Sequence, residues 1–255
     1  MLVVLKTEGG NSNIDPEIRD VENRFSFIFS DIVGMSWTKK VLQDEFFLKA
    51  KKAGYVSRAA FKLKQIQTKH KIIPPGGKVL DLGCAPGAWL QVACQEIRNK
   101  NKGGLVLGID IQDVSVPVRF CDKRVSVLKA DAMALTPKLL RTYSEEGFDV
   151  VLSDMMDSTT GHSDIDVVRS MELAGTAFQL ATGRHPDMED EKLHDGVLVD
   201  GGNLVMKIFE GAGIQEFVAY TRPFFTKVSR VRPDATRKIS REFYLVCKGR
   251  KPSKC

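Results

Sequence analysis

Five short apolar segments that alternate with longer stretches of mixed polarity constrain the fold of this chain more than any other feature. Each segment is rich in Val, Leu or Ile and is bounded by Gly or Asp, as buried strands of a parallel sheet are. Stretches of helical character connect them, which is typical of right-handed crossovers. We therefore predict an α/β fold with strands at residues 78–83, 104–110, 125–131, 148–154 and 202–209.

Two further segments near the C-terminus predict an addition to this sheet. Residues 224–231 (FFTKVSRV) and 241–248 (REFYLVCK) are rich in β-branched and aromatic residues and lie close together in the sequence. Their proximity suggests an antiparallel pairing at one end of the sheet. The predicted architecture is a Rossmann-like, mostly parallel seven-stranded sheet with an antiparallel terminal strand and helices on both faces.

The N-terminus and one internal segment do not follow this alternation of predicted strands and helices. Residues 1–43 are interpreted as an N-terminal extension, and residues 44–251 as the main domain. Residues 182–196 are polar, acidic and flanked by turn formers, which predicts a surface insertion. His185 and His194, within that insertion, are expected to be surface residues rather than metal ligands.

Composition argues against several classes of protein. No apolar run approaches the roughly 18 to 20 residues of a membrane-spanning helix, so we expect no integral membrane protein. The five cysteines form no CxxC pair and the four histidines are scattered, so we predict neither a metal site nor a disulfide framework. These features favour the cytoplasm or an organellar matrix, including that of mitochondria, over secretion.

The positive charge of the chain is concentrated in two segments. The net charge is +6, and residues 38–71 carry ten Lys or Arg while residues 222–254 carry eleven. If both segments fold onto one face, they form a basic surface that would bind the phosphates of a polyanion such as RNA. The alternative, two solvated lysine-rich faces without a partner, stays open on charge alone.

The most specific motif is LDLGCAPGAW, residues 80–89, where a predicted strand gives way to a helix. Gly83 and Gly87 allow backbone torsions and close approaches that side chains would block, so a ligand can lie against the main chain. Asp110 ends the next strand and could accept hydrogen bonds from a ribose, while Asp131 could accept from an adenine amino group and Trp89 could line the pocket. Asp131 could equally cap a helix or turn.

The ligand expected here lacks a pyrophosphate. An NAD-binding dehydrogenase would need the GxGxxG loop, and this loop instead carries a proline among its glycines. S-adenosylmethionine fits better.

Taken together, five motifs in order resemble the FtsJ/RrmJ family of ribosomal RNA (uridine-2′-O)-methyltransferases, over about residues 44–250. They are GYVSRAAFKL (54–63), LDLGCAPGAWLQVA (80–93), VLSDM (151–155), GGNLVMKIFEG (201–211) and ATRKISREFYLV (235–246). The resemblance implies a class I methyltransferase that uses S-adenosylmethionine. The cofactor-binding residues predicted on this basis are Gly83, Cys84, Ala85, Pro86, Gly87, Trp89, Asp110, Ile111, Asp131, Ala132 and Asp154.

The same resemblance implies a catalytic Lys-Asp-Lys-Glu tetrad, which here is Lys62, Asp154, Lys207 and Glu242. Methyl transfer to a ribose hydroxyl needs aligned reactants and a group that helps remove a proton. A lysine can do so when a nearby cation and partial burial favour its neutral amine. Lys207 also stands out by itself, because a lysine inside the apolar run LVMKIF is costly to bury without a purpose.

The substrate implied is structured RNA, most simply a uridine of large-subunit ribosomal RNA, bound by a monomeric enzyme. The phosphate-binding candidates are Lys49, Lys52, Arg58, Arg237 and Lys238.

One departure from the family concerns the loop after Asp154-Met155, where the usual Ala-Pro-Asn is replaced by Met156-Asp157-Ser158. The resemblance implies that this loop flanks the target nucleotide. The departure therefore leaves open which nucleotide is methylated and how fast the methyl group is transferred. The alternatives are a transfer RNA 2′-O-methyltransferase, a non-catalytic RNA-binding factor of ribosome assembly, and a methyltransferase acting on a small molecule or protein.

Overall fold

The computed structural model divides the chain into two units, Met1–Glu45 and Phe46–Cys255. The predicted N-terminal extension, 1–43, lies outside the described residues. The structure describes residues 45–97, 103–157, 160–186 and 193–252.

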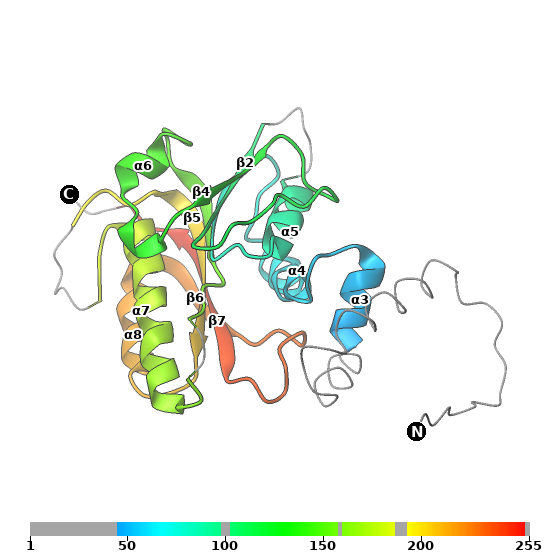
Figure 1. Cartoon of the computed structure of the whole chain (residues 1–255). Helices are drawn as coiled ribbons and strands as arrows, with labels where there is room; N and C mark the ends of the chain where they lie inside the picture. The colour runs from blue at the N-terminus through cyan, green and yellow to red at the C-terminus, as the bar shows by residue number, and fades with distance from the viewer. Residues whose placement is uncertain (1–44, 98–102, 158–159, 187–192, 253–255) are drawn as a thin grey trace, which may run out of the picture. The chain divides into compact units, whose positions relative to one another are not determined.

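A single seven-stranded sheet forms the centre of the second unit, in the order β3-β2-β1-β4-β5-β7-β6 (Figure 1). The first five strands are parallel to one another, and β7 is antiparallel to both of its neighbours, β5 and β6. The predicted α/β class and the antiparallel C-terminal addition are confirmed. The strands are β1 Lys78–Leu82, β2 Leu105–Asp110, β3 Val125–Lys129, β4 Phe148–Ser153, β5 Leu198–Phe209, β6 Phe225–Val231 and β7 Glu242–Arg250.

Strand β5 begins four residues before its predicted start. Leu198 pairs with Phe148, but the next pairing along the strands is Val150 with Asn203, so the register shifts between them. Gly201, whose φ is +78°, lies within this irregular part of β5. In the sequence, the glycine pair at 201–202 resembles the boundary of a strand, whereas in the fold it lies inside one.

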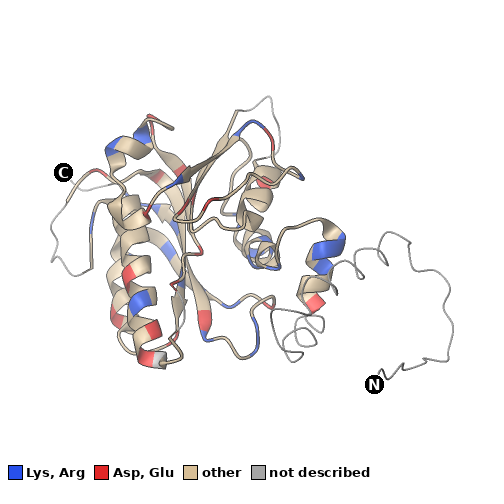
Figure 2. Cartoon of the chain, viewed as in Figure 1, with Lys and Arg blue, Asp and Glu red and all other residues tan. Residues whose placement is uncertain are grey.

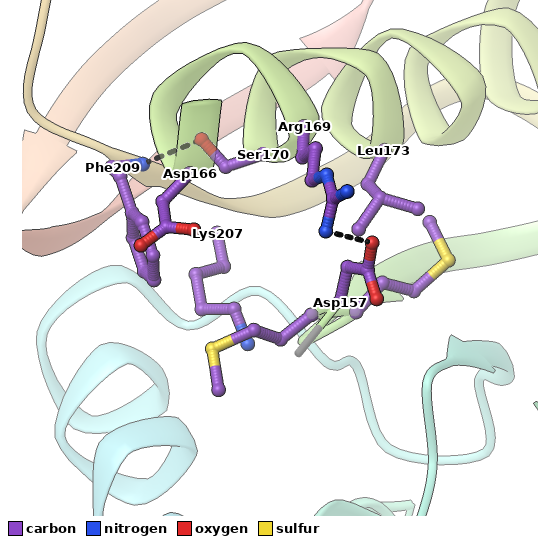
Figure 3. Close-up of a pocket in the computed structure, with 9 residues that line it drawn as sticks. Asp157, Asp166, Arg169, Ser170, Leu173, Lys207 and Phe209 are labelled. Carbon is purple, nitrogen blue, oxygen red and sulfur yellow. Dashed lines mark hydrogen bonds and ion pairs between the residues drawn. The ribbon is translucent and has the colours of Figure 1, made fainter. Parts of the chain in front are cut away.

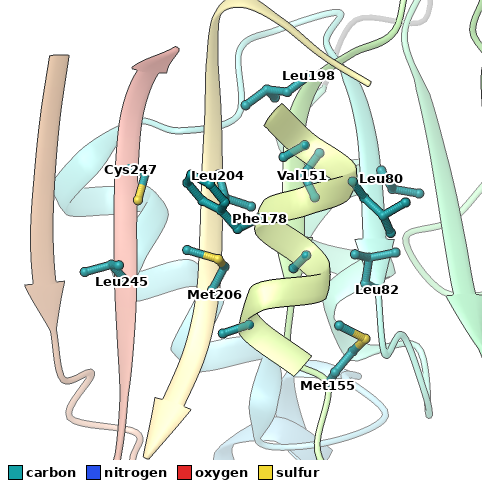
Figure 4. Packing of buried hydrophobic residues seen from close by; sticks show 14 of the residues in the cluster. Leu80, Leu82, Val151, Met155, Phe178, Leu198, Leu204, Met206, Leu245 and Cys247 are labelled. Atoms are coloured by element: carbon teal, nitrogen blue, oxygen red, sulfur yellow. The ribbon is translucent and has the colours of Figure 1, made fainter. Parts of the chain in front are cut away.

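Helices cover both faces of the sheet, and each face has its own apolar core. One core surrounds Phe178 (Figure 4). It includes residues of helices α7 and α8, and the Phe178 ring contacts those of Phe217 and Phe225. The other core includes residues of α4 and α5. The helices are α3 Glu45–Ala53, α4 Ala59–His70, α5 Ala88–Glu96, α6 Pro137–Arg141, α7 Ser163–Thr182 and α8 Ile214–Thr221, with short 3-10 turns at Ala132–Ala134 and Arg222–Phe224.

The strand order reverses at the centre of the sheet. Strand β1 lies between β2 and β4, so the connections that leave β1 and β3 run in opposite directions across the sheet. In open α/β sheets, ligands bind at the carboxyl ends of the strands beside such a reversal. Gly83 follows β1 there, and Asp154 follows β4, with the Asp154 N–H donating to the Leu82 carbonyl at 3.1 Å.

The predicted insertion at 182–196 is bounded by secondary structure on both sides. Helix α7 runs to Thr182, and residues 187–192 lie outside the described residues. The described ends are anchored, because Tyr220 Oη donates to the His185 carbonyl and Arg141 donates to the Gly196 carbonyl. His185 and His194 are half-buried rather than fully exposed. No helix in the described parts of the chain has the length and apolar composition needed to cross a membrane.

Candidate active site

The loop between β1 and α5 is shaped by its two glycines. Gly83 has a φ of +76°, and a Cβ at this position would lie 2.7 Å from the Cα of Met155. Gly87, with a φ of +103°, is the N-cap of α5, and a Cβ there would meet the ring of Pro117 at 2.7 Å. Both positions therefore require glycine for the torsion and for the close approach of another segment.

Asp110 holds this loop at the end of β2. Its carboxylate accepts from the Ala85 N–H at 2.8 Å and from the Gln112 N–H at 2.9 Å. A carboxylate has about four acceptor positions, so it can still accept from a hydroxyl group such as those of a ribose. The side chain next in sequence, Ile111, is 68% exposed and offers an apolar surface at the same strand end.

Asp131 and Ala132 follow β3 at the neighbouring strand end. Asp131 is exposed and accepts from the Met133 N–H at 2.9 Å, so it caps the 3-10 turn that begins at Ala132. Asp131 therefore caps this turn, as one of its two sequence interpretations expected. Asp131 lies two residues after Lys129, the last residue of β3, which pairs with Asp110 at the end of β2.

The structure places Trp89 elsewhere than expected. The indole is 2% exposed, donates from Nε1 to the Ala59 carbonyl at 2.9 Å, and contacts the ring of Tyr244 at a centroid distance of 5.6 Å. A side chain with these contacts belongs to the core between α4, α5 and β7. Its described role is to fix helix α4, which carries Lys62, rather than to line an open pocket.

Asp81 is a candidate that the sequence analysis missed. It lies in β1 with 0% exposure, and neither carboxylate oxygen has a hydrogen-bond partner among the described residues. Burial raises the pKa of Asp81 well above its usual range, and the nearby Asp154 and Asp110 carboxylates raise it further. The signal was available, because an acid inside the apolar run VLDL is as unusual as the lysine inside LVMKIF.

Three carboxylates thus converge on the loop that Gly83 begins. The negative charges of Asp154 and Asp110 each raise the pKa of Asp81. S-adenosylmethionine carries a sulfonium and an ammonium group, and both are positive charges that such a cluster would stabilise. The residues present therefore fit this cofactor.

The first half of the tetrad lies within the sheet. Lys207 Nζ, from β5, donates to the Asp154 carbonyl oxygen at 2.6 Å and lies 3.1 Å from Asp154 Oδ1. Tyr244, the partner of Lys207 in the β5–β7 register, donates from Oη to the same Oδ1 at 2.7 Å. Burial pushes the pKa of Asp154 upward, but Lys207, Lys62 and the Tyr244 hydrogen bond outweigh it and hold that pKa below its usual value.

The second half joins a helix to the sheet. Lys62 Nζ, from α4, lies 2.5 Å from Glu242 Oε1 at the start of β7. Lys62 Nζ also lies 5.9 Å from the centre of the Tyr244 ring, so Tyr244 separates the two ion pairs. The side chains of Lys62 and Glu242 are 13% and 9% exposed. The four predicted tetrad residues are therefore brought together around one buried tyrosine that the sequence analysis did not single out.

The predicted phosphate-binding residues differ in how available they are. Lys52, Arg237 and Lys238 are exposed, and Lys49 lies over the ring of Phe46. Arg58 instead donates to the Ala235 carbonyl, and burial together with the nearby Arg237 lowers its pKa. Arg58 thus ties the start of α4 to the β6–β7 connection. Figure 2 shows Lys and Arg on α3 and along that connection, and several acidic residues on α7.

Comparison with known proteins gives consistent matches over this domain. The FtsJ-like methyltransferase family matches residues 55–250. The ribosomal RNA large subunit methyltransferase E of Desulfatibacillum aliphaticivorans is 39% identical over 209 residues, covering 82% of this chain and 91% of that protein. The protein of the same name from Methanocaldococcus jannaschii is 38% identical over 217 residues, covering 83% and 80%.

A solved structure described as a ribosomal RNA methyltransferase, from Plasmodium falciparum, superposes on this fold. It has a TM-score of 0.61 and 25% identity, and the match covers 78% of this chain and 100% of that one. The resemblance drawn from the five motifs is confirmed by these comparisons.

Proposed function

The chain belongs to the FtsJ-like methyltransferase family, and from this premise we propose that it transfers a methyl group from S-adenosylmethionine to a ribose 2′-hydroxyl of RNA. The proposed substrate is a uridine of large-subunit ribosomal RNA, and the names of the relatives give large-subunit ribosomal RNA as the substrate of those proteins. The observation that carries the proposal is the meeting of Lys62, Asp154, Lys207 and Glu242 beside the Gly83 loop.

When bound, S-adenosylmethionine supplies a methyl group activated by its sulfonium. We assign Asp110 to the ribose of the cofactor, Asp131 to its adenine amino group, and Asp81 to its positive charges. The three acidic residues near Gly83, which are Asp81, Asp110 and Asp154, support this assignment. Asp154 can contribute to both sites, because it belongs to the acidic cluster and to the Lys207 ion pair.

The proposed roles within the tetrad follow from its two ion pairs. Lys62 would pass one of its protons to Glu242, 2.5 Å away, and accept the proton of the ribose hydroxyl, so that the pair takes up one proton. Lys207 and Asp154 would hold the attacking oxygen in line, because their mutual contacts fix both side chains. The new oxygen–carbon bond forms as the sulfur–carbon bond breaks, and the proton stays with the Lys62–Glu242 pair.

The basic residues support a polyanionic substrate. Lys52, Arg237 and Lys238 are exposed and can contact phosphates, while Arg58 positions the β6–β7 connection that carries Arg237. We further propose that the enzyme acts as a monomer in the compartment where ribosomal RNA is processed, either the cytoplasm or an organellar matrix. Sedimentation of the full chain with and without RNA tests the oligomeric state.

The test of the function is methyl transfer from labelled S-adenosylmethionine to three separate substrates: free large-subunit ribosomal RNA, assembled large subunits and total transfer RNA. We expect the label in a 2′-O-methyluridine of ribosomal RNA, and no transfer by Lys207→Ala. Label in transfer RNA would redirect the proposal to that substrate. Binding of cofactor and RNA without any transfer would favour a non-catalytic assembly factor.

A further inference from the structure

Cationic side chains at the catalytic end of the sheet have acidic partners. Lys207 pairs with Asp154 at 3.1 Å. Arg169, on α7, pairs with Asp157 at 2.9 Å beside Lys207 (Figure 3). The positive charges of these two residues are therefore largely compensated within the protein.

Helix α4 and strand β7 meet twice, once at the active site and once far from it. They carry the Lys62–Glu242 ion pair near their first residues. Near their last residues, Lys248 Nζ donates to the carbonyl oxygen of His70 at 2.6 Å. Glu242 and Lys248 lie on the same face of β7, because they are six residues apart and side chains alternate between faces. Six strand residues span about 20 Å, so the second meeting point lies about that far from the ion pair.

Four lysines lie at this second meeting point, and we call Lys69, Lys71, Lys227 and Lys248 the distal lysine cluster. Lys227 of β6 is paired in register with Lys248, so the two side chains share one face of the sheet. Lys69 and Lys71 flank His70 at the end of α4. Burial lowers the pKa of His70, and the charges of Lys69, Lys248 and Lys227 lower it further.

The distal lysine cluster has no acidic partner among the described residues. The ion pairs between these residues include none of its four lysines. Helix α4 and strand β6 contain neither Asp nor Glu. Lys69, Lys71 and Lys227 are exposed, so their charges face solvent.

Stability alone does not favour this arrangement. A helix C-terminus attracts cations, and Lys248 meets that need through its hydrogen bond to the His70 carbonyl. Lys227 lies directly opposite Lys248, and like charges opposite each other on neighbouring strands destabilise a sheet. Residues that break a rule of stability in this way are expected at functional sites.

We propose that the distal lysine cluster is a second RNA-binding surface, which contacts phosphates of the substrate about 20 Å from the tetrad. The inference rests on the proposed function for the identity of the RNA and adds a remote contact to it. Helix α4, between the cluster and the tetrad, has no acidic side chain that would repel the phosphates. RNA is favoured over a membrane, because one structured RNA can reach both ends of the two elements that carry the Lys62–Glu242 ion pair.

The test compares the double variant of Lys69→Gln and Lys227→Gln with a control double variant of Lys123→Gln and Lys138→Gln. The control lysines are also exposed, and they lie before β3 and in α6, whereas β6 forms the other edge of the sheet. Binding of large-subunit ribosomal RNA to the full chain, with S-adenosylhomocysteine bound, is measured over a range of salt concentrations. The kcat and KM of methyl transfer to the same RNA are measured as well.

We expect the slope of log Kd against log salt concentration to fall by about 1 for each lysine removed from the cluster, and the Kd to rise by about tenfold or more at low salt. The KM should rise similarly, while kcat should stay within about twofold because the tetrad is intact. The control variant should bind as the wild type does. Equal salt slopes in the two double variants would overturn the inference.

A short RNA distinguishes a remote contact from one beside the active site. A fragment with only the methylated nucleotide and its adjoining base pairs should bind the test variant and the wild type within about twofold of each other. An equal loss of affinity for the fragment and for the whole RNA would place these lysines at the target nucleotide, against the inference. If the wild type transfers no methyl group, the salt slope of RNA binding still decides the matter.

Thermal unfolding and a lipid control complete the test. The Tm of Lys227→Gln should equal or exceed that of the wild type, because the substitution removes the repulsion from Lys248. A lower Tm would mean that Lys227 serves the fold, contrary to the inference. Loss of binding to anionic phosphatidylserine vesicles in the test variant, with RNA binding unchanged, would assign the cluster to a membrane and would also overturn it.

Discussion

The two halves of the active site lie at the same edge of the sheet but are built from different parts of the polypeptide. The cofactor loop depends on backbone geometry, because Gly83 and Gly87 both have positive φ and both lie against neighbouring segments. The tetrad depends on charged side chains from four separate elements, held in two ion pairs around Tyr244. Substitutions in the cofactor loop should therefore act through steric strain. Substitutions in the tetrad should act by leaving a buried charge without its partner.

The largest expected effect is on the tetrad. Lys207→Met should lower the single-turnover rate of methyl transfer by about 10²-fold or more, the cost of misplacing the attacking oxygen by about 1 Å. It should also destabilise the fold by about 3 to 5 kcal/mol, since Asp154 would keep a buried charge without its lysine partner. Quench-flow kinetics and urea unfolding measure the two effects.

Lys78→Met is the matched control for this variant. Lys78 pairs with Glu146, whose side chain is 82% exposed, at the opposite ends of the strands. An ion pair this exposed contributes little to stability, so the stability and the rate should change little. Equal losses in Lys78→Met and Lys207→Met would contradict the distinction between a tetrad residue and an ordinary ion pair.

The next effect tests the backbone half. Gly83→Ala places a Cβ 2.7 Å from the Cα of Met155 at a φ of +76°, so the loop or the segment after β4 must shift. Gly103→Ala has nearly the same φ, +75°, but meets nothing within 4 Å. Each variant carries a torsional cost of about 1 to 3 kcal/mol, and only the first adds a steric conflict.

Cofactor affinity should therefore fall at least tenfold in Gly83→Ala and stay unchanged in Gly103→Ala, as measured by calorimetry with S-adenosylmethionine. A similar affinity in both variants would mean that close approach to Met155 does not shape the cofactor site. Thermal unfolding of both variants separates the torsional cost from the steric one.

This contrast also explains what the sequence could and could not predict. The cofactor loop is contiguous in the sequence, so its glycines and the helix that follows can be recognised within ten residues. The tetrad is spread from Lys62 to Glu242, and only the motif resemblance allowed it to be assembled before the strand order was known. Tyr244 was missed because nothing in the run REFYLVCK indicates that its hydroxyl meets Asp154.

Trp89 and Arg58 show the opposite difficulty. Both lie in conspicuous motifs and were assigned to ligand contacts, yet both hold protein elements together. Trp89 donates to the Ala59 carbonyl and Arg58 donates to the Ala235 carbonyl. Large side chains near a site can bind the ligand or support the elements around it, and sequence patterns do not distinguish these roles because burial and partners depend on the tertiary fold.

Asp81→Asn tests the acidic cluster that joins the two halves. Burial raises the pKa of Asp81, so its carboxyl gives stability that is present below the unfolded pKa of about 4 and is lost as the pH rises toward the folded pKa. Asparagine has no such titration. The Tm of the variant relative to the wild type should therefore increase from pH 4 to pH 7 in the absence of cofactor.

The affinity of Asp81→Asn for the cofactor should fall, whereas its relative Tm rises with pH. If Asp81 faces the positive charges of S-adenosylmethionine, the variant should bind it about tenfold more weakly, the loss expected for one charge-assisted hydrogen bond. A Tm difference that does not vary with pH would show that Asp81 titrates alike in the folded and unfolded chain. Unchanged affinity would remove Asp81 from the cofactor site.

The smallest effect isolates the residue that lies between the two ion pairs. Tyr244→Phe keeps the ring that Trp89 and Lys62 contact and removes only the 2.7 Å hydrogen bond to Asp154. The fold should lose about 1 kcal/mol, since Lys207 still compensates the carboxylate. Because that hydrogen bond helps to lower the pKa of Asp154, its removal should bring the pKa closer to the usual value.

The stability that Asp154 contributes is present above its unfolded pKa of about 4 and is lost as the pH falls through its lower, folded pKa. In Tyr244→Phe this acid-side loss should therefore be smaller and should end at a higher pH than in the wild type, which Tm measurements below about pH 5 can detect. Identical pH profiles would mean that Tyr244 contributes only its ring. In that case Lys62 and Lys207 alone would keep Asp154 ionised, and the two ion pairs would not depend on the hydroxyl that lies between them.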